Sequence, residues 1–136
     1  MSEPIWIDEA DALAIHDRLL ALHGSGGVRD EAMLKSALAG PLRHRAHTPG
    51  ADTIDLATLY AAGIVRNHPF ADGNKLTGFV VGVLFLELNG YRFKASEADA
   101  AQAMLELAAG TLEQAGFAAF LRAHAKIAWA QYLARS

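Results

Sequence analysis

The segment from Asn74 to Leu88 constrains the fold more than any other part of the chain. As a helix it carries apolar residues almost all the way round, including Val83 and Leu84. Such a helix is stable only when neighbouring elements cover it, because water disfavours a continuous apolar surface. Its longest apolar run, Phe79 to Leu88, is interrupted by Glu87 and is too short to cross a bilayer. We therefore expect a soluble protein whose core surrounds this helix.

Composition and local signals predict helices elsewhere as well. The 136 residues fit one domain, and the hydrophobic fraction of 52% is rich in alanine and leucine, which favour helices. Apolar spacing, capping residues and Gly or Pro stops predict helices from Asp8 to about His23, from Asp30 to Gly40-Pro41, from Ile54 to about Arg66, from Asn74 to Leu88, from Ser96 to about Ala109, and from Thr111 onward with a kink near His124. Tyr91 to Phe93 is predicted to be briefly extended. The expected fold is an all-α, compact orthogonal helical bundle, with one domain over residues 1–136.

One stretch between the second and third predicted helices lacks a helical pattern. Residues 42–52 show no apolar period and contain Pro49 and Gly50, which favour turns. We expect an exposed loop or a short hairpin here. His44 and His47 are three residues apart, but without a predicted helix or a third ligand this spacing does not favour a metal site.

Composition also excludes several classes of function. The chain has no cysteine, so it contains no disulfide scaffold, no thiolate zinc site and no cysteine nucleophile. The net charge of −3 gives no reason to expect direct binding of nucleic acid. Because the amino terminus lacks the basic residues and apolar run of a signal peptide, we expect a cytoplasmic protein that does not bind membranes.

The most informative motif follows the third predicted helix. Residues 68–75 read His-Pro-Phe-Ala-Asp-Gly-Asn-Lys. Pro69 disfavours helical geometry at His68, so the helix should end there and a tight loop should follow. The next helix begins near Asn74, and the free N–H groups and partial positive charge at its start attract phosphate. The motif therefore predicts an anion-binding loop.

The side chains of this loop suit phosphate chemistry. His68 carries an imidazole that can take a proton from an attacking hydroxyl. Asp72 offers oxygen to Mg²⁺, which prefers one or two carboxylates together with phosphate oxygens. Gly73 lets the backbone approach an anion closely, and Lys75 adds a positive charge. Phe70 is apolar and is expected to anchor the loop in the core.

Structural interpretations of the single residues remain open. Asp72 and Asn74 are both common helix caps, and Asn74 can cap the helix and bind phosphate at once. An isolated His68 would more often be an ordinary, partly buried histidine. His16, His23 and His124 are taken as surface or core histidines without a role in the site.

The sequence His-Pro-Phe-x-Asp-Gly-Asn at residues 68–74 resembles the signature of the Fic/Doc (death-on-curing) family. Lys75 stands where most Fic enzymes have glycine and is typical of the Doc branch. The His-Gly-Ser-Gly-Gly turn at 23–27 and the Leu-Glu-Leu-Asn-Gly-Tyr run at 86–91 are also similar to Doc-type toxins. The resemblance extends over nearly the whole chain.

This resemblance implies a function and a set of roles. Doc-type toxins transfer the terminal phosphate of ATP to a threonine of a translation elongation factor and are silenced by an antitoxin. By motif position, His68 would be the catalytic base and Asp72 the Mg²⁺ ligand. Phosphate would be bound by Gly73, Asn74 and Lys75, with Arg66 as a further contact. The stretch with Arg43, His44 and Arg45 corresponds to a flap that would help to dock the target.

One departure from the family pattern leaves the activity open. The family usually continues Asn-Lys-Arg-Thr, whereas this chain has Leu76 in place of the arginine. Loss of an arginine that stabilises the transition state can lower the rate of phosphoryl transfer by about 10³ to 10⁵. Two alternatives therefore stand beside a phosphate-transferring toxin. One is a Fic-type AMP transferase, and the other is an inactive binding module that only engages an antitoxin.

Overall fold

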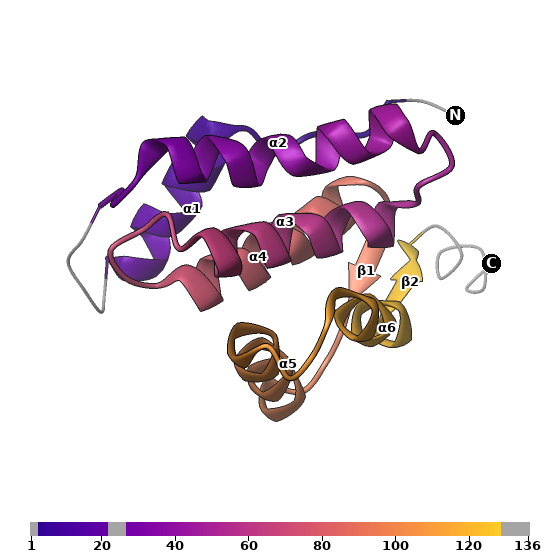
Figure 1. Cartoon of the computed structure of the whole chain (residues 1–136). Coiled ribbons are helices and arrows are strands. Elements are labelled where there is room, and N and C mark those ends of the chain that lie inside the picture. The colour runs from indigo at the N-terminus through magenta and orange to yellow at the C-terminus, as the bar shows by residue number, and fades with distance from the viewer. Residues whose placement is uncertain (1–2, 22–26, 129–136) are drawn as a thin grey trace.

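A computed structural model describes residues 3–21 and 27–128 of the chain (Figure 1). In chain order the elements are α1 (Glu9–Leu20), α2 (Glu31–His47), α3 (Thr53–Asn67), α4 (Asn74–Leu88), β1 (Tyr91–Phe93), α5 (Glu97–Ala109), α6 (Gln114–His124) and β2 (Ala125–Ile127). The predicted helical fold class is confirmed, and the extended piece at Tyr91–Phe93 is confirmed as β1. None of the described helices is long and apolar enough to cross a membrane.

The core is built around a close contact between α3 and α4. A side chain added at Gly78 would lie 3.0 Å from the carbonyl oxygen of Ala61, and one added at Gly82 would lie 3.1 Å from that of Ala57. The two helix backbones therefore approach more closely than larger residues allow. The fully buried Val81 and Phe85 of α4 continue the same contact surface. As predicted, α4 is central, and it shares this position with α3.

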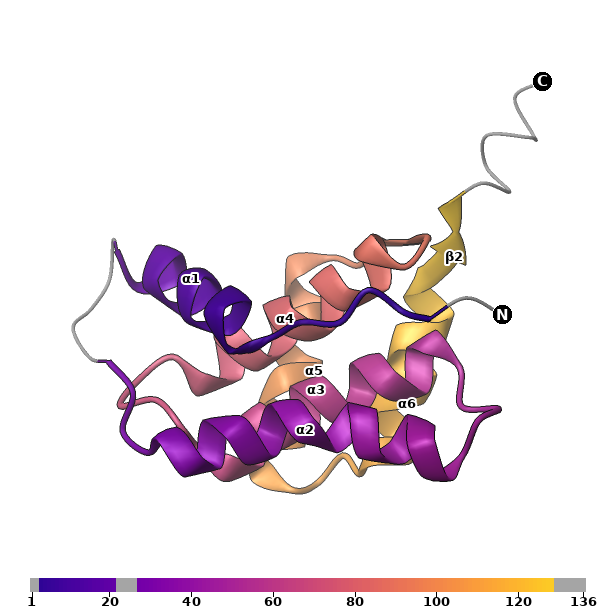
Figure 2. The same ribbon diagram turned by 90° about the horizontal axis from the view of Figure 1, so that it is seen from above.

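The segment before α1 starts near the carboxyl end of α4, where Ile5 contacts Asn89, and runs along α4 to α1, as Figure 2 shows. Asp8 caps α1 through a reciprocal capping box with Asp11, which confirms the predicted start of this helix. The hydroxyl of the buried Tyr60 donates to the carbonyl of Ile7 and accepts from its N–H group, at 3.1 and 3.0 Å. Burial raises the pKa of Tyr60 to about 12. Leu22 and His23 lie outside the described residues.

Helix α2 is longer than the sequence predicted. It continues through Gly40 and Pro41 to His47, so the predicted loop or hairpin from residue 42 is wrong over its first half. Proline inside a helix costs about 3 kcal/mol. Here Pro41 is buried, as is Leu38, and α2 lies beside α3 in both Figures 1 and 2. Apolar burial against α3 offsets the missing hydrogen bond, an effect that local sequence signals do not contain.

The last part of the chain contains a small sheet. Ser96 accepts a hydrogen bond from the N–H of Asp99 and starts α5 as predicted. The predicted cap at Thr111 is wrong: α6 starts at Gln114, and the Thr111 hydroxyl bonds to the carbonyl of Glu106. The predicted continuation of this helix past His124 is wrong over Ala125–Ile127, because β2 forms there and pairs antiparallel with β1, and residues 129–136 lie outside the described residues. A pairing between segments this far apart in sequence leaves no local pattern.

Candidate functional site

The motif loop begins where α3 ends, at His68. This residue has φ 52° and ψ 52°, in the left-handed region that residues other than glycine rarely adopt. Pro69 excludes the helical conformation at His68, so the predicted end of α3 is confirmed. The His68 side chain is exposed. Strained backbone held in place by its surroundings is frequent at functional sites.

A second chain segment holds this strained loop from outside. The N–H groups of Arg29 and Asp30 both donate to the carbonyl of Pro69, at 2.7 and 3.0 Å. The guanidinium of Arg29 donates to the carbonyl of His68 at 2.8 Å, and Ala71 N–H donates to the carbonyl of Gly27. The loop is thus ordered by residues that precede α2, about 40 positions earlier in the sequence.

Inside the loop, Asn74 uses its side chain to hold the backbone. Its Oδ1 accepts from the N–H of Phe70 at 3.0 Å, and its Nδ2 donates to the carbonyl of the same residue at 2.9 Å. Asn74 is only 4% exposed. Both ends of its amide are therefore engaged within the protein, and the side chain supports the loop from inside.

Phe70 and His16 form the floor under the loop. Phe70 is fully buried, and its ring stacks face to face on the ring of His16 at a centroid distance of 3.8 Å. His16 Nε2 lies 2.8 Å from the carbonyl oxygen of Asp72. This buried histidine of α1 therefore contacts the loop at both Phe70 and Asp72.

Helix α4 starts at Gly73, a position where any other residue would be strained. Gly73 has φ 78°, and a side chain added here would meet a methyl carbon of Leu20 at 2.9 Å. The Gly73 N–H donates to Oδ1 of Asp72 at 2.8 Å. Among the described residues no side chain caps α4, so the backbone N–H groups of Asn74 and Lys75 point outward without a partner.

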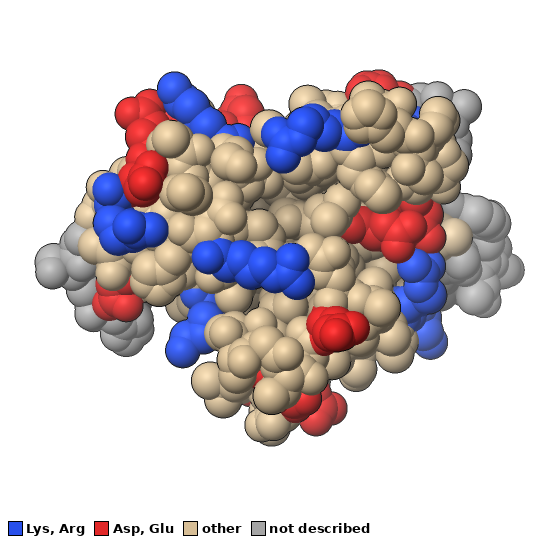
Figure 3. Space-filling model, viewed as in Figure 1, with Lys and Arg blue, Asp and Glu red and all other residues tan. Residues whose placement is uncertain are grey.

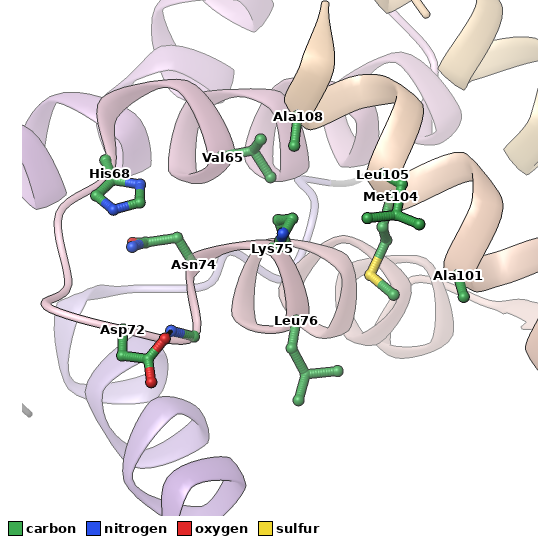
Figure 4. A pocket seen from close by; sticks show the side chains of 11 residues that line it. Val65, His68, Asp72, Asn74, Lys75, Leu76, Ala101, Met104, Leu105 and Ala108 are labelled. Carbon is green, nitrogen blue, oxygen red and sulfur yellow. Dashed lines mark hydrogen bonds between the residues drawn. The ribbon is translucent and has the colours of Figure 1, made fainter. Parts of the chain in front are cut away.

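A pocket of about 600 Å³ opens beside this helix start (Figure 4). At one end are side chains of the motif loop and the first turn of α4. At the other end, Figure 4 shows a wall from α5 that is apolar. The lining residues are Val65, His68, Asp72, Gly73, Asn74, Lys75, Leu76, Ala101, Met104, Leu105 and Ala108.

Leu76, the departure from the family pattern, lies on the rim of this pocket. Its side chain is 39% exposed and does not belong to the buried core. The position can therefore accept a longer, charged side chain without burying a charge.

Other predicted site residues lie elsewhere. Arg66 lines a smaller cavity between α2 and α3, together with Arg43, and does not line the pocket beside His68. Arg43, His44 and Arg45 lie in the last turns of α2, so the expected flap is helical. His44 borders Asp55 and Thr58 near the start of α3, which is the end opposite to the motif. Neither Arg66 nor these three residues therefore line the pocket beside the motif loop.

A metal ion would find a single carboxylate here. The described residues contain no group of three or more His, Asp or Glu side chains that could hold a metal ion. The exposed Asp72 has one oxygen on the Gly73 N–H, and its other oxygen faces no protein donor in the described part of the chain. One carboxylate fits Mg²⁺ that takes most of its ligands from phosphate and water.

Two contributors to the site escaped the sequence interpretation. The sequence predicts His16 as an ordinary surface or core histidine and indicates no role for Arg29. Both act through contacts with residues 38 or more positions away. The apolar wall of α5 was likewise missed, because its alanines and leucines are typical of any amphipathic helix.

Comparisons with known proteins agree with the motif. Residues 6–86 match the model of the Fic/DOC family. Over 127 residues the chain is 31% identical to a protein described as Toxin Doc from Mycolicibacterium smegmatis (strain ATCC 700084 / mc(2)155). That similarity covers 84% of this chain and 94% of the relative. The family match contains α1 to α3, the motif loop and most of α4, and the chain belongs to the Fic/DOC family.

Proposed function

We propose that this protein is a Doc-type toxin that transfers the terminal phosphate of ATP to a hydroxyl group of a target protein. One observation carries the proposal: an exposed histidine, a single carboxylate and an uncapped helix start border one pocket. Membership of the Fic/DOC family and similarity to a Toxin Doc support the same assignment. A translation elongation factor is the proposed target, and the cytoplasm is the proposed location.

The proposed reaction divides the work between His68 and the start of α4. The imidazole of His68 takes the proton of the target hydroxyl while the hydroxyl oxygen forms a bond to the γ-phosphorus of ATP. The bond between the γ-phosphorus and the bridging oxygen breaks, and ADP leaves with its electrons. The N–H groups of Asn74 and Lys75 and the Lys75 ammonium hold the phosphate oxygens. The buried Asn74 amide supports this arrangement by fixing Phe70, two positions after His68.

Asp72 is the proposed metal ligand. One of its carboxylate oxygens accepts from the Gly73 N–H at 2.8 Å, and the other, which has no protein donor in the described part of the chain, would hold Mg²⁺. When bound with the nucleotide, the ion would supply charge neutralisation for the phosphate oxygens. His16 contacts the Asp72 carbonyl and so fixes the backbone that carries this carboxylate.

The apolar α5 wall supports a second part of the proposal, which is control by an antitoxin. Leu105 is 53% exposed and Leu76 is 39% exposed, and both border the pocket. Exposed leucines around a groove are the contacts that an amphipathic helix uses. We propose that the antitoxin lays such a segment over the pocket and thereby denies it to nucleotide or target.

Transfer of label from ATP tests the reaction. The purified protein is incubated with a cell lysate and ATP labelled at either the γ- or the α-phosphate, with His68→Ala as the control. The proposal requires label from γ-labelled ATP only, and none with His68→Ala. Label from α-labelled ATP would instead establish an AMP transferase, and no label with either substrate, in a folded protein, would leave the binding-module alternative.

A further inference from the structure

The described residues contain a second large cavity, remote from the motif loop. It has a volume of about 720 Å³ and lies beside the two-stranded sheet, next to the carboxyl end of α4. Four of its lining residues are basic: Arg92, Lys94, His124 and Lys126. We call this cavity the basic cleft. The motif pocket lies at the opposite end of α4, about 20 Å away at 1.5 Å per helical residue.

The register of the sheet places these basic residues in two opposed pairs, in which His124 is the last residue of α6 and its ring Nδ1 already contacts the carbonyl of Phe120 at 2.8 Å. Arg92 lies directly opposite Lys126 in the antiparallel pairing. Lys94 lies opposite His124, because its N–H donates to the His124 carbonyl at 2.8 Å just beyond the paired strands. Neighbours across the strands are about 5 Å apart, and neighbours along a strand are about 7 Å apart.

This arrangement is electrostatically unsatisfied. Like charges directly opposite each other destabilise a sheet. In the described part of the chain none of Arg92, Lys94 and Lys126 forms an ion pair with a carboxylate. Glu87 lines the same cleft, but its carboxylate accepts a hydrogen bond from the N–H of Phe93 at 3.4 Å. Three permanent cations therefore face one carboxylate, in a chain with a net charge of −3.

The charge is local, which argues against nucleic acid as the partner. Figure 3 shows basic and acidic side chains interspersed over one face of the molecule, without a broad basic area. Proteins that bind nucleic acid usually present an extended basic surface, often with a high isoelectric point, whereas the value for this sequence is about 6.0. A confined group of basic side chains suits a short ligand with few negative charges.

From this geometry we propose that the basic cleft binds an extended acidic segment of a partner protein, with carboxylates at alternate positions. In an extended chain, side chains at i and i+2 lie on one face and are about 7 Å apart. This repeat equals the spacing between the Arg92–Lys126 pair and the Lys94–His124 pair. Each pair then shares one carboxylate, and the repulsion between Arg92 and Lys126 becomes an attraction to the ligand.

The test uses a dye-labelled peptide, Thr-Glu-Thr-Glu-Thr-Glu-Thr, and fluorescence anisotropy with the full chain. Two further peptides serve as controls, one with glutamine for glutamate and one with the three glutamates adjacent. The alternating peptide should bind at least tenfold more tightly than either control, and salt should weaken it. Equal binding of the two glutamate peptides would overturn the proposed spacing, and tighter binding of an oligothymidylate would make the cleft a nucleic-acid site instead.

Variants locate the binding. Arg92→Gln with Lys126→Gln should lower the affinity for the alternating peptide at least tenfold. The control removes two positive charges elsewhere, by Arg18→Gln with Lys35→Gln, and should change the affinity less than twofold. Equal losses in both double variants would show that net charge alone attracts the peptide and would overturn the site.

A stability measurement separates loss of the site from loss of the fold. Lys126→Glu places a carboxylate opposite Arg92, so it should raise the melting temperature while it abolishes binding of the alternating peptide. A lowered melting temperature would contradict the repulsion on which the inference rests. Retained binding by this variant would contradict the role of Lys126 directly.

Discussion

At each end of α4 an asparagine side chain makes the same pair of hydrogen bonds to a neighbouring segment, but the surroundings of the two asparagines differ. At the amino end, the Asn74 amide bonds to both the N–H and the carbonyl of Phe70. At the carboxyl end, the Asn89 amide bonds in the same way to both groups of Ile5, at 2.8 and 3.0 Å. Each asparagine thus imitates a β-bridge and ties a neighbouring segment to the central helix.

The difference lies in burial and in what is left unbonded. Asn74 is buried and the helix start beside it keeps free N–H groups, whereas Asn89 is only half-buried and adds a bond to the carbonyl of Phe85. The carboxyl end is therefore closed, and the amino end is rigid yet open to a ligand. This contrast supports the proposed role of Asn74, which is to hold fixed the backbone proposed to bind phosphate.

The largest expected effect is on phosphate transfer, when an arginine is introduced at the amino end of α4 and compared with an arginine introduced at its carboxyl end. Leu76 and Leu88 are similarly exposed leucines, at 39% and 41%. Leu76→Arg would add a forked positive charge at the pocket rim and should raise phosphate transfer by about 10³. Leu88→Arg should leave transfer unchanged. Labelling with γ-labelled ATP measures both, and melting curves confirm that the variants fold.

A second variant checks that this gain belongs to the proposed reaction. His68→Ala should lower transfer by about 10² to 10⁴, and adding it to Leu76→Arg should give the activity of His68→Ala alone. A folded Leu76→Arg protein without a gain would show that arginine at this position does not limit the reaction. An equal gain in Leu88→Arg would remove the distinction between the two ends.

Removing the two asparagine amides should affect stability unequally. Asn74→Ala leaves the buried N–H and carbonyl of Phe70 without partners and should lower the free energy of unfolding by about 2 to 4 kcal/mol. Asn89→Ala should cost about 1 kcal/mol, because water reaches the groups of Ile5. Urea denaturation measures both values. A larger loss for Asn89→Ala would reverse the proposed order of rigidity.

The two glycines that flank α4 offer a matched backbone test. Gly73 and Gly90 have φ of 78° and 93°, so alanine is strained at both. Gly73→Ala would also press on Leu20, whereas the space at Gly90 is open. We expect losses of about 2 kcal/mol for Gly73→Ala and about 1 kcal/mol for Gly90→Ala. Equal losses in urea denaturation would mean that Leu20 moves aside freely.

The smallest expected effect is on how the free energy of unfolding depends on pH, through the buried Tyr60 of α3. Burial raises the pKa of Tyr60, which holds Ile7, to about 12 from an ordinary value of 10. Below pH 10 both the folded and the unfolded chain keep this proton, and the full stability is present. Between pH 10 and 12 the unfolded chain loses this proton first, so the free energy of unfolding falls with rising pH.

Tyr60→Phe isolates this contribution. Compared with the original chain, the variant should show a smaller fall in the free energy of unfolding between pH 9 and pH 11.5 in urea. Hydrogen exchange should become faster at Ile5 and Ile7 in the variant, with no change at Phe70. An unchanged pH dependence would assign the loss of stability to other titrating groups.

Local chemistry is the part of this protein that the sequence predicted well. The caps at Asp8 and Ser96, the end of α3 before Pro69 and both bounds of α4 were all expected from the sequence and are confirmed. Each depends on forces within about one helical turn, such as a side chain bonding a nearby N–H or a proline ring excluding a conformation. The eight-residue motif belongs to the same class, because its chemistry is contiguous.

Tertiary structure decided what depends on distant residues. Helix α2 continues through Pro41 because burial against α3 outweighs a local penalty, and β2 forms because β1 supplies a partner more than 30 positions earlier. Whether Arg66 lines the pocket beside His68 also depended on packing between helices. By itself the sequence determined which groups are available for phosphate chemistry. The fold determined which of them remain free, because hydrogen bonds and burial between distant segments use up the others.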